Sequence, residues 1–357
     1  MKQKSNLSHQ KILTLDKDYQ EAAKAARLIY VLDSKPGIIR QKKAKGYSYS
    51  FEGKTLKDKA QLERIKKLAI PPSWTQVWIC PRENGHIQAT GLDLNGRKQY
   101  RYHPEWNKLR SETKFHRLYE FGKVLPLLRR KIKKDMNDSS LTERKVLATV
   151  INLMEHTYIR VGNNGYEKLY GSYGLTTMKD RHVTIKKEDV LFSFTGKKGI
   201  EHSITIKNKK LARIIRQCRD IPGKELFQYY TADGQKKSID SGMVNNYIKE
   251  ITQAEFTAKD FRTWAGSLQA LESFRSLDEP LNASAIKKNI LTVLDAVSSK
   301  LGNSRSICRK YYIHPGLIKL YEENKLKHFF QVSSLKRKTT GLSAEEKILM
   351  QTLKKPI

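Results

Sequence analysis

The chain has 357 residues, and its 69 Lys and Arg residues against 36 Asp and Glu residues give it a formal net charge of +33. The length allows two domains, because single hydrophobic cores usually stop growing near about 250–300 residues. The charge is spread along the whole chain and repels itself in a compact protein, which favours a polyanionic partner, with nucleic acid as the first candidate. A ribosome-associated or merely basic protein is the alternative that composition leaves open.

Residues 1–109 are predicted to form a small, sheet-rich domain. Aromatic and small polar residues alternate over 47–51, which predicts a strand, and apolar residues recur at helical spacing over 62–69. The turn dipeptides Asn84-Gly85 and Asn95-Gly96 separate the remaining strand-like runs, which are 77–80, 87–90 and 98–102. The pattern indicates an antiparallel meander with one or two helices.

Residues 110–330 are predicted to form a larger, mainly helical domain. Ser140–Glu143 resembles a capping box that opens a helix. Between 183 and 206 the apolar period changes to two on either side of a turn at 195–199, which predicts a β-hairpin with lysines at its tip. Helical spacing resumes in four later segments, which are 211–218, 243–251, 260–274 and 286–300.

The expected fold class is therefore α+β. A small N-terminal antiparallel sheet domain precedes a larger α-helical catalytic domain that carries a short β-hairpin or three-stranded sheet. Residues 331–357 are expected to form a lysine-rich C-terminal tail with little periodicity outside 345–353.

Cysteine usage and hydropathy bear on the compartment. The three cysteines, Cys80, Cys218 and Cys308, have no paired spacing, which is typical of a reducing cytoplasm and argues against disulfides or a zinc site. The segment Met1–Asn6 lacks an apolar stretch, and no run of 18 apolar residues occurs. We therefore expect a cytoplasmic protein without a membrane span.

A tyrosine pair among cations is the most informative feature, in the segment Ser-Ile-Cys-Arg-Lys-Tyr-Tyr-Ile-His-Pro over 306–315. A phenol with a pKa of about 10 is a poor nucleophile at neutral pH. Nearby cations favour the phenolate and also suit a phosphate electrophile, so we hypothesise tyrosine attack on a phosphodiester. Tyr311 and Tyr312 could also be core aromatics, and their physics alone does not choose between them.

Three further cations could serve the same chemistry. Arg160 follows a predicted helix, whose last carbonyls it could instead satisfy. Lys197 lies at the predicted hairpin tip, where a solvated lysine is ordinary but a proton donor is also possible. Arg262 lies one turn before Gly266 in a helix that opens with a capping box at Thr257. A glycine there destabilises the helix but leaves room for something to approach.

Two kinds of cofactor site are not predicted. The chain has no Gly-x-x-x-x-Gly-Lys-Ser/Thr loop, so it carries no signature of ATP binding. No carboxylate–histidine cluster predicts a site for two metal ions, so we expect neither a metal nor another cofactor. A phosphoryl-transfer enzyme of this kind must stabilise the transition state with guanidinium and ammonium groups.

The sequence resembles the bacterial, poxvirus-like branch of the type IB DNA topoisomerases from about Val31 to about Asn324. Ten short motifs carry the resemblance in the family's order. They are Pro36–Ile38, Leu68–Trp74, Val77–Pro81, Gly85–Gly91, Gly96–Pro104, Ile159–Asn163, Gly174–Thr177, Phe194–Lys197, Lys259–Thr263 and Cys308–Pro315.

The resemblance implies roles for five residues. Tyr312, favoured over Tyr311 by its place before Ile-His-Pro, would attack the scissile phosphate and form a 3′-phosphotyrosyl enzyme with a free 5′-hydroxyl strand. Arg160 and Arg262 would hold the non-bridging oxygens, and Lys197 would protonate the leaving 5′-oxygen. Asn303 stands where poxvirus members have a histidine and could donate a hydrogen bond to the phosphate.

The resemblance also implies the reaction and its partner. The enzyme would relax supercoiled duplex DNA by cleavage, strand rotation and religation without ATP or metal, as a nucleoid-associated monomer whose two domains clamp the duplex. Gln99, Tyr100, Tyr102 and Tyr166 match residues that meet DNA in the family, although the tyrosines could instead pack on the sheet. A tyrosine recombinase and a non-catalytic basic nucleic-acid-binding protein are the alternatives.

Overall fold

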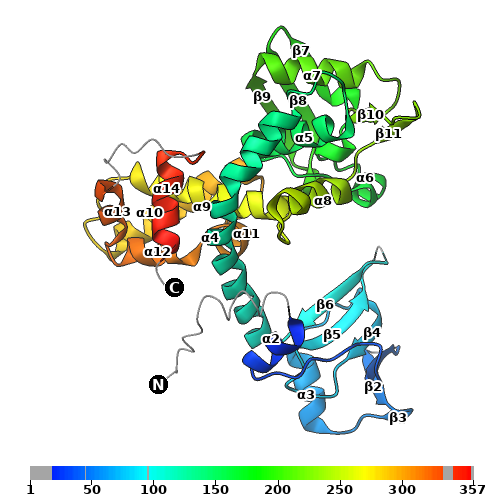
Figure 1. Cartoon of the computed structure of the whole chain (residues 1–357). Coiled ribbons are helices and arrows are strands. Elements are labelled where there is room, and N and C mark those ends of the chain that lie inside the picture. The colour runs from blue at the N-terminus through cyan, green and yellow to red at the C-terminus, as the bar shows by residue number, and fades with distance from the viewer. Residues whose placement is uncertain (1–17, 45, 95, 333–340, 355–357) are drawn as a thin grey trace. The chain divides into compact units, whose positions relative to one another are not determined.

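The computed structural model of this chain describes residues 18–44, 46–94, 96–332 and 341–354. It divides into two compact units, Met1–Arg117 (unit 1) and Leu118–Ile357 (unit 2) (Figure 1). The predicted boundary at residue 109 and the division at residue 117 both fall within one helix, α4 (Pro104–Asp135). Residue 95 of the second predicted turn, the N-terminal segment 1–17 and parts of the predicted tail lie outside the described residues.

Unit 1 is built on a six-stranded antiparallel sheet with the order β3-β2-β1-β4-β5-β6. Its strands are β1 (Ile38–Lys42), β2 (Tyr47–Phe51), β3 (Lys54–Thr55), β4 (Thr75–Ile79), β5 (Ile87–Leu92) and β6 (Lys98–Tyr102). The predicted meander is confirmed, but β1 was not predicted, because its sequence Ile-Ile-Arg-Gln-Lys does not alternate. It lies between two other strands, where Ile39 pairs with Ser50 on one side and Trp78 on the other.

Two helices and the start of α4 cover this unit. Helix α3 (Lys59–Lys67), capped by the Asp58 carboxylate, buries Ile65 in the core of the sheet, as its helical spacing predicts. Helix α2 (Tyr19–Ala25) packs with Trp106 and Leu109 of α4 in a smaller second core.

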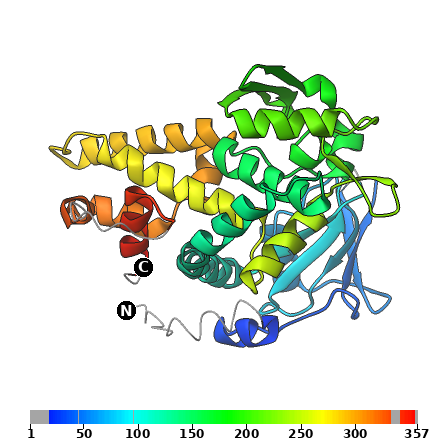
Figure 2. The same ribbon diagram turned by 45° about the horizontal axis from the view of Figure 1, so that its top comes forward.

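Unit 2 is mainly helical, with one three-stranded sheet and a two-stranded ribbon, so the expected α+β class is confirmed (Figure 2). Besides the rest of α4, its helices are α5 (Glu143–Thr157), α6 (Asn164–Tyr170), α7 (Lys209–Arg219), α8 (Ser241–Thr252), α9 (Ala258–Arg275), α10 (Ala283–Leu301), α11 (Arg305–Tyr311), α12 (Pro315–Glu322), α13 (Leu326–Val332) and α14 (Ala344–Leu353). Its strands are β7 (Val183–Lys186), β8 (Asp189–Thr195), β9 (Glu201–Lys207), β10 (Gln228–Tyr230) and β11 (Lys236–Ser238).

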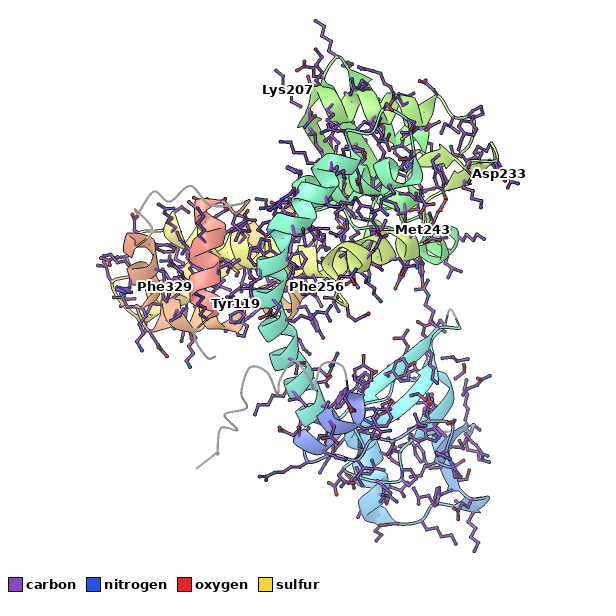
Figure 3. All side chains as sticks on the ribbon, in the orientation of Figure 1. Tyr119, Lys207, Asp233, Met243, Phe256 and Phe329 are labelled. Atoms are coloured by element: carbon purple, nitrogen blue, oxygen red, sulfur yellow. The ribbon has the colours of Figure 1, made fainter. Side chains whose placement is uncertain are left out.

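The core of unit 2 lies among α4, α5 and α9. Phe121 of α4 meets Phe256, which is labelled in Figure 3, and Phe261 edge to face, with ring centroids 5.4 Å and 5.0 Å away. Gly122, the next residue of α4, has no room for a side chain, because a Cβ there would lie 2.6 Å from the Trp264 ring. This close packing fixes α9 against the centre of the unit.

Side-chain caps begin two of the predicted helices, α5 and α9. Helix α5 begins two residues later than the predicted box implies, because Thr142, not Ser140, is its N-cap and accepts from the Lys145 N–H at 3.2 Å. The predicted box at Thr257 is confirmed, since the Asp260 carboxylate accepts from the Thr257 N–H at 2.8 Å. That cap sets the first turn of α9, which carries Arg262.

The C-terminal segment is not only a lysine-rich tail. Part of it forms α14, which buries Ile348 and Leu349 in the core of unit 2. The buried Glu346 carboxylate accepts from Arg129 of α4 at 2.6 Å and from Trp264 Nε1 of α9 at 3.0 Å. A charge buried in this way must be paired, so these bonds join α14 to the helices that frame the site.

Among the helices in the described ranges, none combines the length and the apolar character that a membrane span requires.

Candidate active site

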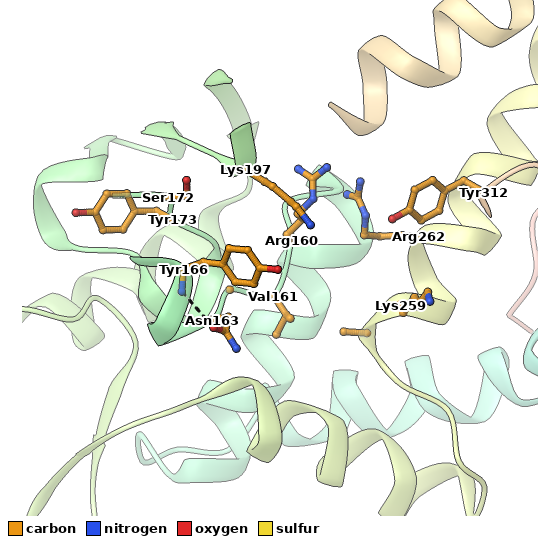
Figure 4. A pocket seen from close by; sticks show the side chains of 12 residues that line it. Arg160, Val161, Asn163, Tyr166, Ser172, Tyr173, Lys197, Lys259, Arg262 and Tyr312 are labelled. Atoms are coloured by element: carbon orange, nitrogen blue, oxygen red, sulfur yellow. Dashed lines mark hydrogen bonds between the residues drawn. The ribbon is translucent and has the colours of Figure 1, made fainter. Parts of the chain in front are cut away.

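A cavity of about 270 Å³ in unit 2 brings together most of the residues singled out from the sequence (Figure 4). Its charged lining consists of four cations, Arg160, Lys197, Lys259 and Arg262, and its aromatic lining includes Tyr166 and Tyr312. No carboxylate is among the described residues that line it. Positive charges packed around one space without a counter-charge favour an anionic guest.

The two arginines are held by the C-terminal ends of two helices. Arg262 donates from Nη1 to the Tyr158 carbonyl at the end of α5 and from Nη2 to the Leu301 carbonyl at the end of α10, the latter at 2.7 Å. Arg160 donates from Nη2 to the Gly302 carbonyl at 2.9 Å. The last carbonyls of a helix lack intrahelical partners and carry partial negative charge, so they are natural acceptors for guanidinium groups.

These contacts correct one interpretation of the sequence. Arg160 does not satisfy the last carbonyls of its own helix, which ends at Thr157. It reaches the end of α10 instead, and the carbonyl at the end of α5 is satisfied by Arg262. Each arginine therefore bridges segments that are far apart in the chain.

Burial makes a further hydrogen-bond acceptor or negative charge favourable beside both guanidinium groups. The Arg262 Nε is buried and has no acceptor among the described residues, although a buried donor without a partner is unfavourable. Burial, and then the charge of Arg262, lower the pKa of Arg160 from 12.5 to about 10. An anion in the cavity would supply the negative charge that this part of the site lacks.

Tyr312 is the tyrosine of the pair that lies in the cavity. Helix α11 ends at Tyr311, and Tyr312 is its C-cap. The Tyr312 hydroxyl points toward Arg262, whose Cζ lies 5.3 Å from the centroid of the tyrosine ring (Figure 4). Tyr311 is 37 % exposed and does not line the cavity. The end of α11 thus separates two neighbouring side chains into different environments.

The backbone of Tyr312 rests directly on α9. A Cβ on Gly266 would lie 2.7 Å from the Tyr312 carbonyl oxygen and 2.8 Å from its Cβ, so only glycine permits this approach. The fully buried Ser267 hydroxyl donates to the Tyr312 carbonyl at 3.1 Å and accepts from the His314 N–H at 3.0 Å. The space that the sequence predicted beside Arg262 is filled by the candidate nucleophile's own backbone.

Lys197 reaches the cavity from the predicted hairpin, which is confirmed. Strands β8 and β9 pair as far as Thr195 and Glu201, and Lys197 lies in the short turn that joins them. Its Nζ lies 5.2 Å from the centroid of the Tyr166 ring, which belongs to α6. The lysine is exposed, whereas Arg262 is buried and Arg160 is partly buried.

Asn303 does not line the cavity. Its Oδ1 accepts from Arg160 Nη2 at 2.7 Å, and its Nδ2 donates to the Leu301 carbonyl at 3.3 Å. The side chain therefore contacts the Arg160 guanidinium group without lining the cavity itself.

The other three predicted DNA contacts lie in unit 1, on the edge strand β6. Tyr100 and Tyr102 are 43 % and 37 % exposed and stack with ring centroids 5.7 Å apart. Gln99 points to the opposite face, since side chains alternate along a strand, and it donates to the Asp93 carboxylate at 2.8 Å.

Four residues of the site escaped prediction. Lys259 lies one turn before Arg262, a spacing that places both on one helix face and could have revealed it. Ser267, Gly302 and His202 carried no such signal, because their roles depend on long-range contacts. A Cβ on Gly302 would lie 2.9 Å from the His202 ring, and burial, followed by the charges of Arg160 and Arg262, lowers the pKa of His202.

Comparisons with known proteins agree with this geometry. Residues 103–339 match the model of the eukaryotic DNA topoisomerase I catalytic core, and residues 46–93 match that of the bacterial DNA topoisomerase IB N-terminal domain. A DNA topoisomerase 1B from Acanthamoeba polyphaga mimivirus is 34 % identical over 81 % of this chain and 88 % of its own length. The DNA topoisomerase 1B of vaccinia virus (strain Copenhagen) is 25 % identical over 68 % of this chain and 74 % of its own length.

The two family models together cover most of both units, and they divide the chain between a bacterial N-terminal part and a topoisomerase catalytic core. The catalytic-core model includes every residue that lines the cavity. The resemblance inferred from ten short motifs is thereby confirmed, and the chain belongs to the type IB DNA topoisomerases, which are isomerases.

Proposed function

We propose that this topoisomerase relaxes supercoiled duplex DNA through a transient covalent bond between Tyr312 and a backbone phosphate. One observation carries the proposal: a tyrosine hydroxyl points into a cavity that is lined by four cations and by no carboxylate among the described residues. A polyanionic backbone supplies the negative charge that this lining lacks, and the phosphodiester is the electrophile that such cations suit.

The first step is attack by the Tyr312 oxygen on the scissile phosphorus. The phenolic proton passes to water, the new bond joins the tyrosine oxygen to the 3′-phosphate, and the bond from phosphorus to the 5′-oxygen breaks. Arg160 and Arg262 bind the non-bridging oxygens, and Lys259 adds a third positive charge. Because both guanidinium groups are held by helix-terminal carbonyls, they need little reorganisation as charge builds up.

Lys197 protonates the leaving 5′-oxygen. An alkoxide is a poor leaving group in water, so a proton donor is needed when the bond to phosphorus breaks. The ammonium group becomes a neutral amine, and the cut strand ends in a 5′-hydroxyl. An exposed turn between two paired strands suits this role, since the donor must reach the leaving oxygen on the side opposite the nucleophile.

Religation reverses these steps without a nucleotide or metal cofactor. The phosphotyrosyl bond retains the free energy of the broken phosphodiester, and the Lys197 amine takes back the proton as the 5′-oxygen attacks. Between the two steps the free strand end rotates about the intact strand and releases supercoils. We further propose that the enzyme acts as a monomer and that Tyr100 and Tyr102 contact the duplex, since their stacked rings are exposed.

Asn303 acts through Arg160 in this proposal. Its amide oxygen is occupied by the guanidinium group, and the side chain does not line the cavity. We therefore assign it as a positioning residue rather than as a direct ligand of the phosphate, which revises the role that the resemblance implied.

The test is relaxation of a supercoiled plasmid in EDTA without ATP, followed by rapid denaturation to trap protein–DNA adducts. The wild-type protein is expected to relax the plasmid and to form an adduct. Tyr312→Phe should lose both, by on the order of 10⁴-fold or more, because no other group replaces the nucleophile.

Tyr311→Phe is the matched control, because it removes the same hydroxyl from the adjacent residue outside the cavity. It should relax and trap DNA at nearly the wild-type rate. Adduct formation by Tyr312→Phe but not by Tyr311→Phe would assign the nucleophile to Tyr311. Failure of the wild-type protein to relax plasmid over a range of salt would contradict the proposed activity.

A further inference from the structure

We infer that the ring of Tyr166 holds the Lys197 ammonium group at the cavity, so that Tyr166 is a positioning residue for proton donation rather than only a DNA contact. The inference rests on the proposed role of Lys197 and deepens it. The Lys197 Nζ lies 5.2 Å from the centroid of the Tyr166 ring, and both side chains line the cavity (Figure 4).

Lys197 has no carboxylate partner in the ranges that the structure describes. Glu201, the next acid along the hairpin, accepts instead from the Thr195 hydroxyl at 2.7 Å. Lys179, in the segment that leads into the hairpin, shows the usual alternative, because it is paired with Glu167 at 2.7 Å and Glu225 at 3.0 Å. The aromatic face therefore takes the place that a carboxylate has beside other lysines.

An aromatic partner suits a general acid in this cavity better than a carboxylate would. A carboxylate beside Lys197 would compete for its proton and repel the incoming phosphate. The face of an aromatic ring attracts an ammonium group but cannot accept its proton as a base. The attraction is weak enough for Lys197 to move to the leaving oxygen, and it disappears once the proton has been transferred.

The position of the ring follows from the segment that carries Arg160. Helix α6 begins three residues after Val161, and its N-cap Asn163 accepts from the Tyr166 N–H at 3.2 Å with Oδ1. No residue of α6 is buried, and Tyr166 is 36 % exposed, so core packing does not explain the placement of its ring. The cap thus links Tyr166, whose ring holds the proton donor, to the segment that carries Arg160, a proposed phosphate ligand.

The test measures single-turnover cleavage of a duplex oligonucleotide with either oxygen or sulfur at the 5′-bridging position of the scissile phosphate. A thiolate leaves without protonation, so the sulfur substrate bypasses the general acid. Tyr166→Leu should cleave the oxygen substrate about tenfold more slowly than the wild type and the sulfur substrate at the wild-type rate. Tyr166→Phe keeps the aromatic face and should be within about threefold of wild type on both.

Tyr170→Leu is the matched control. Tyr170 lies one turn later on α6, is 46 % exposed and does not line the cavity, although its ring centroid is only 6.0 Å from that of Tyr166. It should behave as the wild type on both substrates. Lys197→Ala sets the scale for loss of the general acid. It should cleave the oxygen substrate slowly and recover its cleavage rate on the sulfur substrate.

Three results would overturn the inference: wild-type cleavage of the oxygen substrate by Tyr166→Leu, equal slowing of that variant on both substrates, or equal slowing by Tyr166→Phe. The last two would mean that Tyr166 acts on the DNA, through its bulk or its hydroxyl. If Lys197→Ala fails to recover on sulfur, the proposed general acid is wrong and the inference falls with it. Failure of the proposed general acid can be distinguished from failure of the inference alone, because it appears in the Lys197→Ala variant itself.

Discussion

Two groups of residues that line the cavity are held in different ways. In the first group, Arg160, Arg262 and Tyr312 are held by bonds to the ends of α5 and α10 and by the contact of Tyr312 with Gly266. The second is Lys197, which lies on an exposed turn with an aromatic ring as its neighbour. The proposed nucleophile and phosphate ligands are thus preorganised, whereas the proposed proton donor is held weakly.

The difference matches the demands of the chemistry. Groups that stabilise charge in the transition state are most effective when they are already in place, because reorganisation then adds nothing to the barrier. A general acid must instead follow the leaving oxygen and later take the proton back. Four substitutions at or next to the firmly held residues test this contrast.

The largest effect is expected from Arg262→Lys. Lysine keeps the charge but cannot reach both helix-terminal carbonyls and present a third donor at once. We expect the single-turnover cleavage rate to fall by about 10²- to 10³-fold, while non-covalent DNA affinity changes little. Arg275→Lys, on the exposed end of the same helix, is the control, and equal rates for the two variants would contradict a preorganised phosphate site.

The next largest effect is expected from Gly266→Ala. Alanine usually stabilises a helix relative to glycine, but here its methyl group would meet backbone atoms of Tyr312 that cannot move aside freely. Displacing the proposed nucleophile should slow cleavage by up to about 10²-fold and lower the midpoint of thermal unfolding. Gln269→Ala on the same helix serves for comparison. A Gly266→Ala protein that is more stable and fully active would show that Tyr312 is not seated on α9.

A smaller effect is expected from Asn303→Ala. Loss of the acceptor at 2.7 Å should loosen Arg160 and slow cleavage about tenfold, in line with a hydrogen bond to a charged group. A double-mutant cycle with Arg160→Ala distinguishes the two roles of Asn303. If the asparagine acts through Arg160, its removal has no further effect once the arginine is gone, whereas additive losses would favour a direct bond to the phosphate.

The smallest effect concerns the dependence of stability on pH. The pKa of His202 lies below its usual value because of burial and the nearby arginines, so the unfolded chain binds a proton at a higher pH than the folded one does. Stability is then lost as the pH falls below about 6.5 toward the lower folded pKa. His202→Gln should show a smaller decrease in the free energy of unfolding between pH 7 and pH 5, measured by urea denaturation. An unchanged decrease would mean that burial and the nearby arginines do not lower the pKa of His202.

Local patterns account for much of what could be predicted. The alternation of residues in 47–51 and 183–206, the cap at Thr257 and the helical spacing of α9 all depend on neighbours in the chain, and they were correct. Strand β1 was missed because its place between two strands supplies the pairing that its own pattern does not indicate. The segment that forms α14 looked like a tail because its buried acid finds its partner in α4.

The sequence by itself determined the family: a tyrosine, two arginines and a lysine stand in the order of a known family, within a strongly basic chain. Only the tertiary structure decided how those groups are held. Arg160 binds a carbonyl 142 residues away, Arg262 binds one 104 residues away, and Asn303 faces an arginine rather than the open cavity. Side-chain type fixes charge and reactivity locally, whereas orientation depends on which distant carbonyls and rings the packed helices bring within reach.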